Sequence, residues 1–273
     1  MKTRTIRFHA ALCALGLMAC LQAPGLAQPP AAAPDRPVPR TDQNSLTAHA
    51  QLLEKAKKGR IDVYFEGDSI TRRWGATDYP KLLENWNENF FGWNAGNFGW
   101  GADTVQNILW RLHDGELDGV HPRVIVFLAG TNDIGYRVAP DQVEARARHI
   151  TGGIQAAVTL MKEKAPGAVI ILMGLFPRND NMAALPVIEK INRNLSQLAD
   201  GKTIRYLNIN DRLADADGVL HEGMTDPDRL HLALKGYQVW ADALKPLFHE
   251  LLGPPANEDH APPPTGNPAA AVP

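Results

Sequence analysis

The sequence predicts an α/β protein in which a parallel sheet carries helices on both faces. Short apolar runs rich in β-branched residues recur along the chain, which is typical of strands that are covered on both faces. Between these runs lie segments with apolar residues at three- and four-residue steps, the spacing of one face of a helix. Strands that alternate with helices favour a parallel sheet, and the active site of such a sheet lies beyond the carboxyl ends of its strands.

Each strand and helix is expected where one of these patterns is clearest. The predicted strands are residues 61–65, a weaker one at 93–98, 123–129, 168–173 and 204–209. A helix is predicted over residues 141–164 and another, close to the C-terminus, around residues 237–247. Glycine-rich turns at residues 67, 99–101 and 130 are expected to open at the carboxyl edge of the sheet.

The N-terminus has the pattern of an export signal. A basic stretch precedes an uncharged apolar run over residues 10–21, which is too short to span a bilayer comfortably, and small residues up to Ala27 offer a cleavage site. This pattern predicts a signal peptide over residues 1–27 and a periplasmic or secreted protein. Residues 17–20 also approximate a bacterial lipoprotein box, which would leave a lipid on Cys20.

Composition marks the rest of the domain boundaries. Residues 28–43 are rich in Pro and Ala, and predict a flexible lead-in. Residues 253–273 are rich in Pro and predict a disordered tail. One globular domain is expected between them, over residues 44–252.

Charge and cysteine content exclude several classes of protein. The 273 residues include 28 Lys and Arg against 30 Asp and Glu, a net charge of -2, so nucleic acid is not an expected partner. No apolar run after the leader is long enough for a transmembrane helix. The two cysteines, Cys13 and Cys20, lie in the leader, so the mature domain has no internal disulfide and no cysteine-ligated metal.

A candidate nucleophile follows the first predicted strand. Gly67 permits a sharp turn, and Ser69 would then lie at a strand-to-helix junction with its hydroxyl exposed and its backbone N–H free. Gly-Asp-Ser alone is a weak signal, because a serine at that place also serves as a helix N-cap. A catalytic serine needs a base, since a neutral hydroxyl is a poor nucleophile.

The candidate base is His231, just before the last predicted helix. Asp228 precedes it by three residues, and a local turn can bring the carboxylate to one ring nitrogen while the other faces the serine. By itself, Asp-x-x-His is more often a pair of structural loop residues. Two further turns could supply donors to an oxyanion: Asn132 after the third strand, and the loop of residues 97–104.

This ordered set of blocks resembles the SGNH (GDSL-like) hydrolase family. The blocks are Gly67-Asp-Ser69, the loop of residues 99–104, Gly130-Thr-Asn132-Asp and Asp228-x-x-His231, and the similarity extends over roughly residues 60–250. It is closest to the branch that contains the catalytic subunits of platelet-activating-factor acetylhydrolase and many bacterial exported esterases. The resemblance implies a three-layer α/β/α sandwich with a central, mostly parallel, five-stranded sheet of the flavodoxin-like kind.

The resemblance also implies a role for each residue. Ser69, His231 and Asp228 would form a catalytic triad, and the oxyanion hole would consist of the N–H groups of Ser69 and Ala102 with the side chain of Asn132. Family members usually have glycine where this chain has Ala102. If the loop needs a positive φ at this position, Ala102 would be strained. Gly101 is then the alternative donor to the oxyanion. Glu66 also departs from the pattern, and is expected either to face solvent or to tune the substrate.

The predicted function is hydrolysis of short-chain acyl esters, acetyl esters above all, through an acyl-enzyme and without metal or cofactor. One alternative is a metal-dependent hydrolase with ligands from the His221, Glu222, Asp226, Asp228 and His231 segment; another is a non-catalytic carbohydrate- or lipid-binding module. Export, together with this resemblance, implies a small-molecule or saccharide ester as substrate.

Three tryptophans are candidates for stacking on a sugar of that substrate. They are Trp74, Trp93 and Trp100, which lie near the predicted mouth of the site, although tryptophan is as often a core residue.

Overall fold

The computed structural model describes residues 33–271. The predicted signal peptide, the alternative lipid site at Cys20 and the first part of the predicted lead-in lie outside the described residues. Among the residues described, no helix is both long and apolar enough to cross a membrane.

Strands and helices alternate along the described chain. In order they are α1 (Gln43–Ala56), β1 (Val63–Gly67), α2 (Ser69–Trp74), α3 (Pro80–Phe90), β2 (Ala95–Asn97), α4 (Val105–His113), β3 (Val124–Leu128), α5 (Thr131–Ile134), η1 (Pro140–Gln142), α6 (Val143–Lys164), β4 (Val169–Met173), η2 (Met182–Ala184), α7 (Leu185–Ser196), β5 (Ile204–Leu207), α8 (Asn210–Leu213), α9 (Leu234–Leu252) and η3 (Pro268–Ala271). The η elements are short 3₁₀ helices.

The five strands form one sheet in the order β2-β1-β3-β4-β5, and all neighbours are parallel. Central strands β1 and β3 are buried at every position, because helices cover them on both sides. This explains why the sequence of β3 is a continuous apolar run instead of an alternating one. The predicted five-stranded α/β sandwich is confirmed, with β1 ending at Gly67, two residues later than expected.

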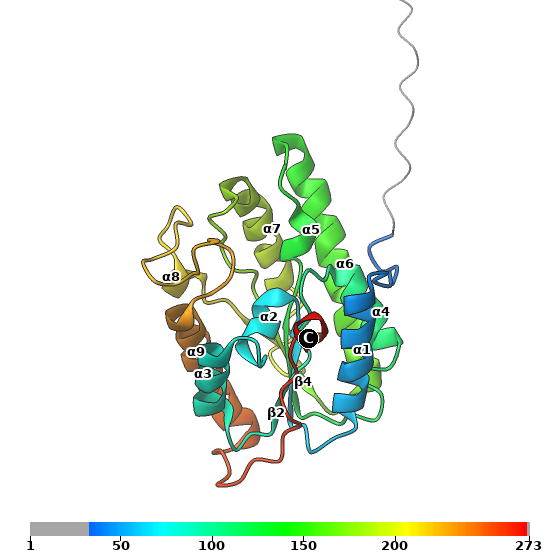
Figure 1. Ribbon diagram of the computed structural model, residues 1–273. Helices are drawn as coiled ribbons and strands as arrows, with labels where there is room; N and C mark the ends of the chain where they lie inside the picture. The colour runs from blue at the N-terminus through cyan, green and yellow to red at the C-terminus, as the bar shows by residue number, and fades with distance from the viewer. Residues whose placement is uncertain (1–32, 272–273) are drawn as a thin grey trace, which may run out of the picture. The chain divides into compact units, whose positions relative to one another are not determined.

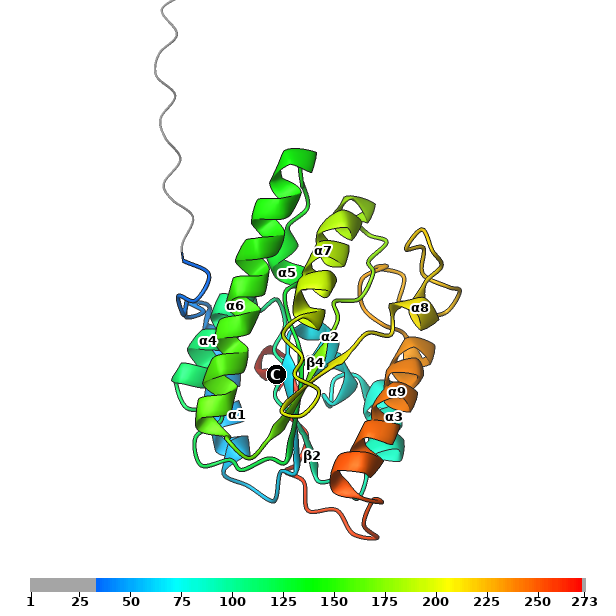
Figure 2. The same ribbon diagram turned by 180° about the vertical axis from the view of Figure 1, so that it is seen from behind.

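Two hydrophobic cores, one on each face of the sheet, hold the layers together. Helices α1, α4, α6 and α7 bury their apolar residues on one face, and α2, α3, α8 and α9 do so on the other. Figures 1 and 2 show the sheet between these two groups of helices. The second core is rich in aromatic rings; Trp74, for example, packs on Trp86, Phe90 and Trp240 at centroid distances of 5.7, 4.9 and 4.9 Å.

The described parts of the lead-in and of the C-terminal tail contact the domain between them. In the lead-in, Val38 N donates to Gln106 O over 2.9 Å. In the tail, Ala256 N donates to Gly92 O over 2.9 Å, and His260 O accepts from Arg60 N over 2.8 Å. Residues 33–42 and 253–271 thus make backbone hydrogen bonds to the domain between them in this structure.

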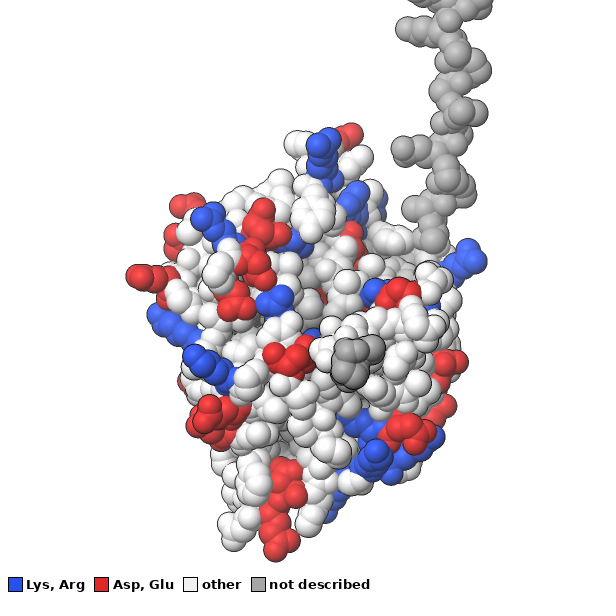
Figure 3. Space-filling model, in the orientation of Figure 1, with Lys and Arg blue, Asp and Glu red and all other residues white. Residues whose placement is uncertain are grey.

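The surface carries mixed charge. In the face shown in Figure 3, Lys and Arg side chains alternate with Asp and Glu side chains, and neither sign fills a continuous region. This distribution offers no electrostatic footprint for a phosphate backbone on that face.

Candidate active site

Ser69 lies where the sequence predicts, at the junction of the first strand and a helix. Strand β1 ends at Gly67, and Asp68 caps α2 by accepting from Ile70 N over 2.9 Å. Ser69 is the first residue of α2, so its backbone N–H has no acceptor within the helix. Gly67 is required at the turn, because a Cβ there would lie 2.4 Å from Leu128 O.

The structure joins Ser69, His231 and Asp228 in one hydrogen-bonded chain. His231 Nε2 lies 2.8 Å from Ser69 Oγ, and His231 Nδ1 lies 2.7 Å from Asp228 Oδ2. The other carboxylate oxygen of Asp228 accepts from the backbone N–H groups of Leu230 and His231, over 3.0 and 2.9 Å. Arg229 has a φ of 56°, and this left-handed residue turns the chain so that Asp228 and His231 meet.

The surroundings of these three hydrogen-bonded residues favour a neutral imidazole on His231 beside an ionised carboxylate on Asp228. Burial by itself would raise the pKa of Asp228, but the N–H groups of His231 and Leu230 donate to the carboxylate and bring its pKa to about 2. Burial lowers the pKa of His231 below 6.5; the bond to Asp228 opposes this change and the positive charge of Arg73 adds to it. An imidazole that is neutral near pH 7 is able to accept a proton from Ser69.

The predicted oxyanion donor Asn132 lies on α5, next to the loop of residues 99–104. Gly130, with a φ of 118°, turns the chain from β3 into α5. Asn132 Nδ2 donates to Asp103 O over 2.8 Å, so one of its two amide hydrogens holds the loop and the second is available to a ligand. Both carboxylate oxygens of Asp133 accept from Val105 N, over 3.3 and 3.1 Å, which ties α5 to the start of α4.

The loop that carries the second predicted donor is held close to α2. A Cβ on Gly99 would lie 2.6 Å from Arg72 N, so the close approach of the loop to α2 requires glycine there. Ala102 has a φ of 62°. The loop therefore does need a left-handed residue, that residue is Ala102 and not Gly101, and its Cβ carries the strain that the sequence predicts for this case.

Comparison with known proteins decides the family. The family model of the GDSL-like lipases and acylhydrolases matches residues 65–239, which include all four blocks. The chain belongs to this GDSL-like acylhydrolase family.

Curated relatives agree with this assignment. The chain is 32% identical over 233 residues to platelet-activating factor acetylhydrolase IB subunit alpha1 of Bos taurus, which covers 83% of this chain and 92% of the relative. It is 34% identical over 217 residues to subunit alpha2 of the same enzyme from Homo sapiens, with 77% and 84% covered. The acylhydrolase described here is thus a serine ester hydrolase.

Solved structures confirm the fold. A candidate acylhydrolase of Bacteroides fragilis superposes with a TM-score of 0.60 at 22% identity, and covers 77% of this chain and 99% of its own. A GDSL-like lipase of Bacteroides thetaiotaomicron superposes with a TM-score of 0.56 at 20% identity, and covers 77% and 98%.

A buried ion-pair network lies behind the site of the acylhydrolase and was not predicted. Arg111 on α4 contacts the carboxylates of Glu66 and Asp103, each over 2.7 Å, and that of Glu116. The expectation that Glu66 faces solvent is wrong, because its side chain is fully buried against Arg111. Arg111 also donates to Phe98 O over 3.0 Å, so the network holds the end of β2 and the loop of residues 99–104 together.

The alternative metal site does not form. Arg73 Nη1 lies 3.1 Å from Asp226 Oδ2 and 3.4 Å from Asp228 Oδ2, so a guanidinium occupies the place between two of the proposed ligands. Over residues 33–271, no group of three or more His, Cys, Asp or Glu side chains is arranged to hold an ion.

The three tryptophans considered for sugar stacking are core residues. Trp74, Trp93 and Trp100 are 0%, 5% and 7% exposed. The Trp100 indole N–H donates to Ser45 Oγ over 2.9 Å, and that of Trp93 to Gly253 O over 3.0 Å. The expectation that they stack on a substrate is wrong, because their rings face the interior of the acylhydrolase.

Proposed function

We propose that this acylhydrolase cleaves short-chain acyl esters, acetyl esters above all, through an acyl-enzyme on Ser69. The observation that carries the proposal is the continuous chain of hydrogen bonds from Ser69 Oγ through His231 to Asp228. Nucleophile, base and orienting acid in this arrangement are what acyl transfer by a serine needs. The acetylhydrolase relatives support the acetyl group as the acyl part.

In the proposed mechanism, His231 Nε2 takes the hydroxyl proton as Ser69 Oγ attacks the ester carbonyl. The negative charge that develops on the carbonyl oxygen is held by the N–H groups of Ser69 and Ala102 and by Asn132 Nδ2. The tetrahedral intermediate collapses to the acyl-enzyme, and His231 gives the proton to the departing alcohol. Water then attacks the acyl-enzyme with His231 again as base, which releases the acid and restores Ser69.

The proposed substrate is an acetylated saccharide outside the cytoplasm. The leader pattern of residues 1–27 supports export of the protein, and exported acylhydrolases meet extracellular or periplasmic polysaccharide. Mass spectrometry of the protein isolated from its host tests the export proposal. A mature N-terminus at Gln28 supports a periplasmic or secreted enzyme, a lipid-bearing Cys20 supports an anchored one, and an intact Met1 contradicts export.

Hydrolysis of p-nitrophenyl acetate tests the mechanism. We expect Ser69→Ala to lower kcat by at least about a thousandfold, because the nucleophile is lost, while EDTA has no effect. Thr159→Ala, which removes an exposed hydroxyl from the far part of α6, is the control and should leave the rate unchanged. A rate that survives Ser69→Ala but is lost in EDTA would move the chemistry to a metal. Tight binding of saccharide without turnover would favour a binding module.

A further inference from the structure

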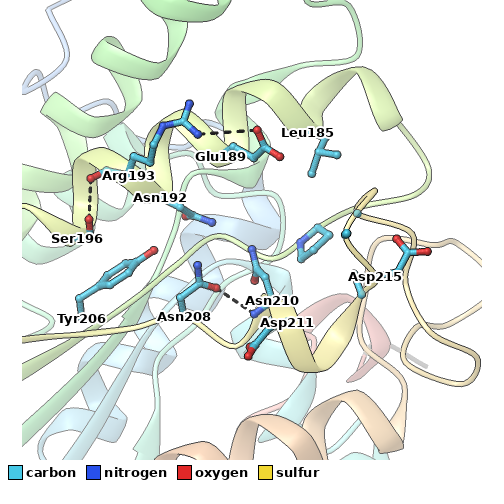
Figure 4. Close-up of a pocket in the computed structure, with 14 residues that line it drawn as sticks. Leu185, Glu189, Asn192, Arg193, Ser196, Tyr206, Asn208, Asn210, Asp211 and Asp215 are labelled. Carbon is cyan, nitrogen blue, oxygen red and sulfur yellow. Dashed lines mark hydrogen bonds and ion pairs between the residues drawn. The ribbon is translucent and has the colours of Figure 1, made fainter.

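A polar cavity of about 510 Å³ lies between α7 and the segment that runs from β5 into α8. Its size is within the range of small-molecule sites. Figure 4 shows Glu189, Asn192 and Arg193 on the α7 side and Tyr206 and Asn208 on the opposite side. The residues that line it do not include any member of the Ser69, His231 and Asp228 chain, so it is a separate feature of the molecule.

Two polar atoms in the wall of this cavity are buried with little or no hydrogen bonding to the described residues. Asn210 Oδ1 has no partner, and Tyr206 Oη interacts only weakly with the Asn208 side chain. Leaving such a group unpartnered costs about 1–3 kcal/mol, and native structures satisfy nearly all of them with protein, water or ligand. The remaining amide of Asn210 is fixed, because Asn210 Nδ2 donates to Leu175 O over 3.0 Å, so Oδ1 keeps one direction.

Hydrogen bonds between neighbouring residues fix the polar side chains at the base of the cavity. Asn208 Oδ1 accepts from Asn210 N over 3.0 Å, and Asn192 Oδ1 accepts from Leu175 N over 2.7 Å. Gly174, the residue after β4, leaves the necessary room, since a Cβ there would lie 2.8 Å from Tyr206 Oη. The polar groups at the base are thus held by their neighbours before any ligand binds.

The chemistry of the wall fits a hydroxyl-rich ligand. The phenol of Tyr206 donates and accepts, and amide groups supply both donors and acceptors, which is what sugar hydroxyls need. Pro177, Leu185 and the Tyr206 ring add apolar surface for the C–H faces of a sugar. The charged groups of Glu189 and Arg193 lie 3.9 Å apart, and their opposite charges offset each other. The lining of the cavity therefore does not favour a small ion of either sign.

One residue links the rim of this cavity to the turn that holds His231. Asn179 Nδ2 donates to Gly218 O, on the cavity rim, over 2.8 Å. Asn179 N donates to Arg229 O, between Asp228 and His231, over 2.9 Å. The cavity and the proposed catalytic residues are therefore neighbours on either side of Asn179.

We propose that this cavity binds a saccharide unit of the substrate, so that the enzyme holds a glycan beside the reacting ester. The inference rests on the proposed function for the identity of that substrate. The cavity supplies binding and no chemistry, so its loss affects KM for a saccharide ester and not the hydrolysis of a small aryl ester.

Two variants test the saccharide site by kinetics. Ala216→Trp fills the cavity from its exposed rim, with Ala216→Ser as the control that keeps the side chain small. Tyr206→Phe removes only the phenol hydroxyl. On acetylated xylo-oligosaccharide we expect Tyr206→Phe to raise KM about five-fold, the value of one hydrogen bond, and Ala216→Trp to raise it further. Both should hydrolyse p-nitrophenyl acetate like the parent enzyme. Unchanged KM values for the oligosaccharide in both variants would overturn the proposal.

Calorimetry separates this proposal from the proposed function. The parent enzyme and Ala216→Trp are titrated with unacetylated xylotetraose, cellotetraose and chitotetraose. Binding of at least one to the parent and to Ala216→Ser, but not to Ala216→Trp, supports the cavity even if no acetylated saccharide is hydrolysed. The cavity proposal fails if none of the three binds, or if Ala216→Trp binds as the parent does, and in either case the loss of aryl ester hydrolysis in Ser69→Ala still supports the proposed mechanism.

Discussion

Arg40 Nη1 donates a hydrogen bond to Gly101 O over 3.0 Å, although 61 residues separate them in sequence. The same nitrogen lies 3.1 Å from Asp103 Oδ1. Arg40 thus holds the residues on both sides of Ala102, whose N–H is a proposed oxyanion donor. Arg40 belongs to residues 28–43, whose composition predicts flexibility, and yet its side chain holds this loop in place.

Loss of this clamp is expected to lower the rate of the chemical step. Arg40→Ala should reduce kcat for p-nitrophenyl acetate by about ten-fold with little change in KM, because a misplaced donor stabilises the oxyanion less well. Arg36→Ala, at an exposed position of the same segment, is the control. A rise in KM at constant kcat would contradict a positioning role for Arg40.

Ala102→Gly is expected to stabilise the protein without loss of activity. A residue with a Cβ at a φ of 62° is strained, and glycine relieves this strain while it raises the entropy of the unfolded chain. The free energy of unfolding should therefore increase by up to about 1 kcal/mol, as measured in urea. Ala102→Val should be less stable than the parent. A less stable Ala102→Gly protein would show that the left-handed conformation costs nothing here.

Arg73→Gln is expected to move the acid limb of the pH–rate profile. His231 must be neutral to accept the proton of Ser69, so kcat/KM rises with pH through the pKa of His231, which burial and Arg73 lower below 6.5. Removal of the positive charge raises this pKa, and the limb should shift to higher pH. Arg73→Lys keeps the charge and should keep the limb in place. A shift to lower pH in Arg73→Gln would contradict the electrostatic role.

Asp68→Asn is expected to flatten the dependence of stability on pH. Burial raises the pKa of Asp68 to about 7, above its ordinary value of 3.8, so the folded protein binds more protons than the unfolded chain between these values. The stability contributed by the protonated group is present at low pH and lost as the pH rises towards 7. Relative to the parent, Asp68→Asn should gain on the order of 2 kcal/mol in unfolding free energy from pH 5 to pH 8. Parallel stability curves for the two proteins would contradict an elevated pKa.

The sequence predicts those parts of the fold and site that local patterns determine. The continuous apolar runs of β3 and β4 indicate covered parallel strands, and three-residue spacing brings Asp228 to His231. Helix α6 begins at Val143, within two residues of its predicted start.

Contacts between segments that lie far apart in the sequence do not produce a local sequence pattern, so they could not be predicted. His49 illustrates this limit, because its ring lies 2.6 Å from Glu116 and 2.9 Å from Asp114, two acids more than sixty positions away. The network around Arg111 is hidden for the same reason. The contacts of residues 33–42 and 253–271 are hidden for this reason too, because most of them pair a backbone group of one segment with a side chain of a distant one, as Trp93 Nε1 does with Gly253 O and Asn107 Nδ2 with Val38 O.

The tail also forms hydrogen bonds with a segment that is synthesised much earlier. Asn267 Oδ1 accepts from Asn44 Nδ2 over 2.9 Å, which joins α1 to a segment 223 residues further along the chain. A ribosome releases the chain from its N-terminus onward, so α1 emerges long before its C-terminal partner exists. The contacts of Asn267 and Ala269 with α1 can therefore form only after the 223 to 225 residues that separate them from Asn44 have been synthesised.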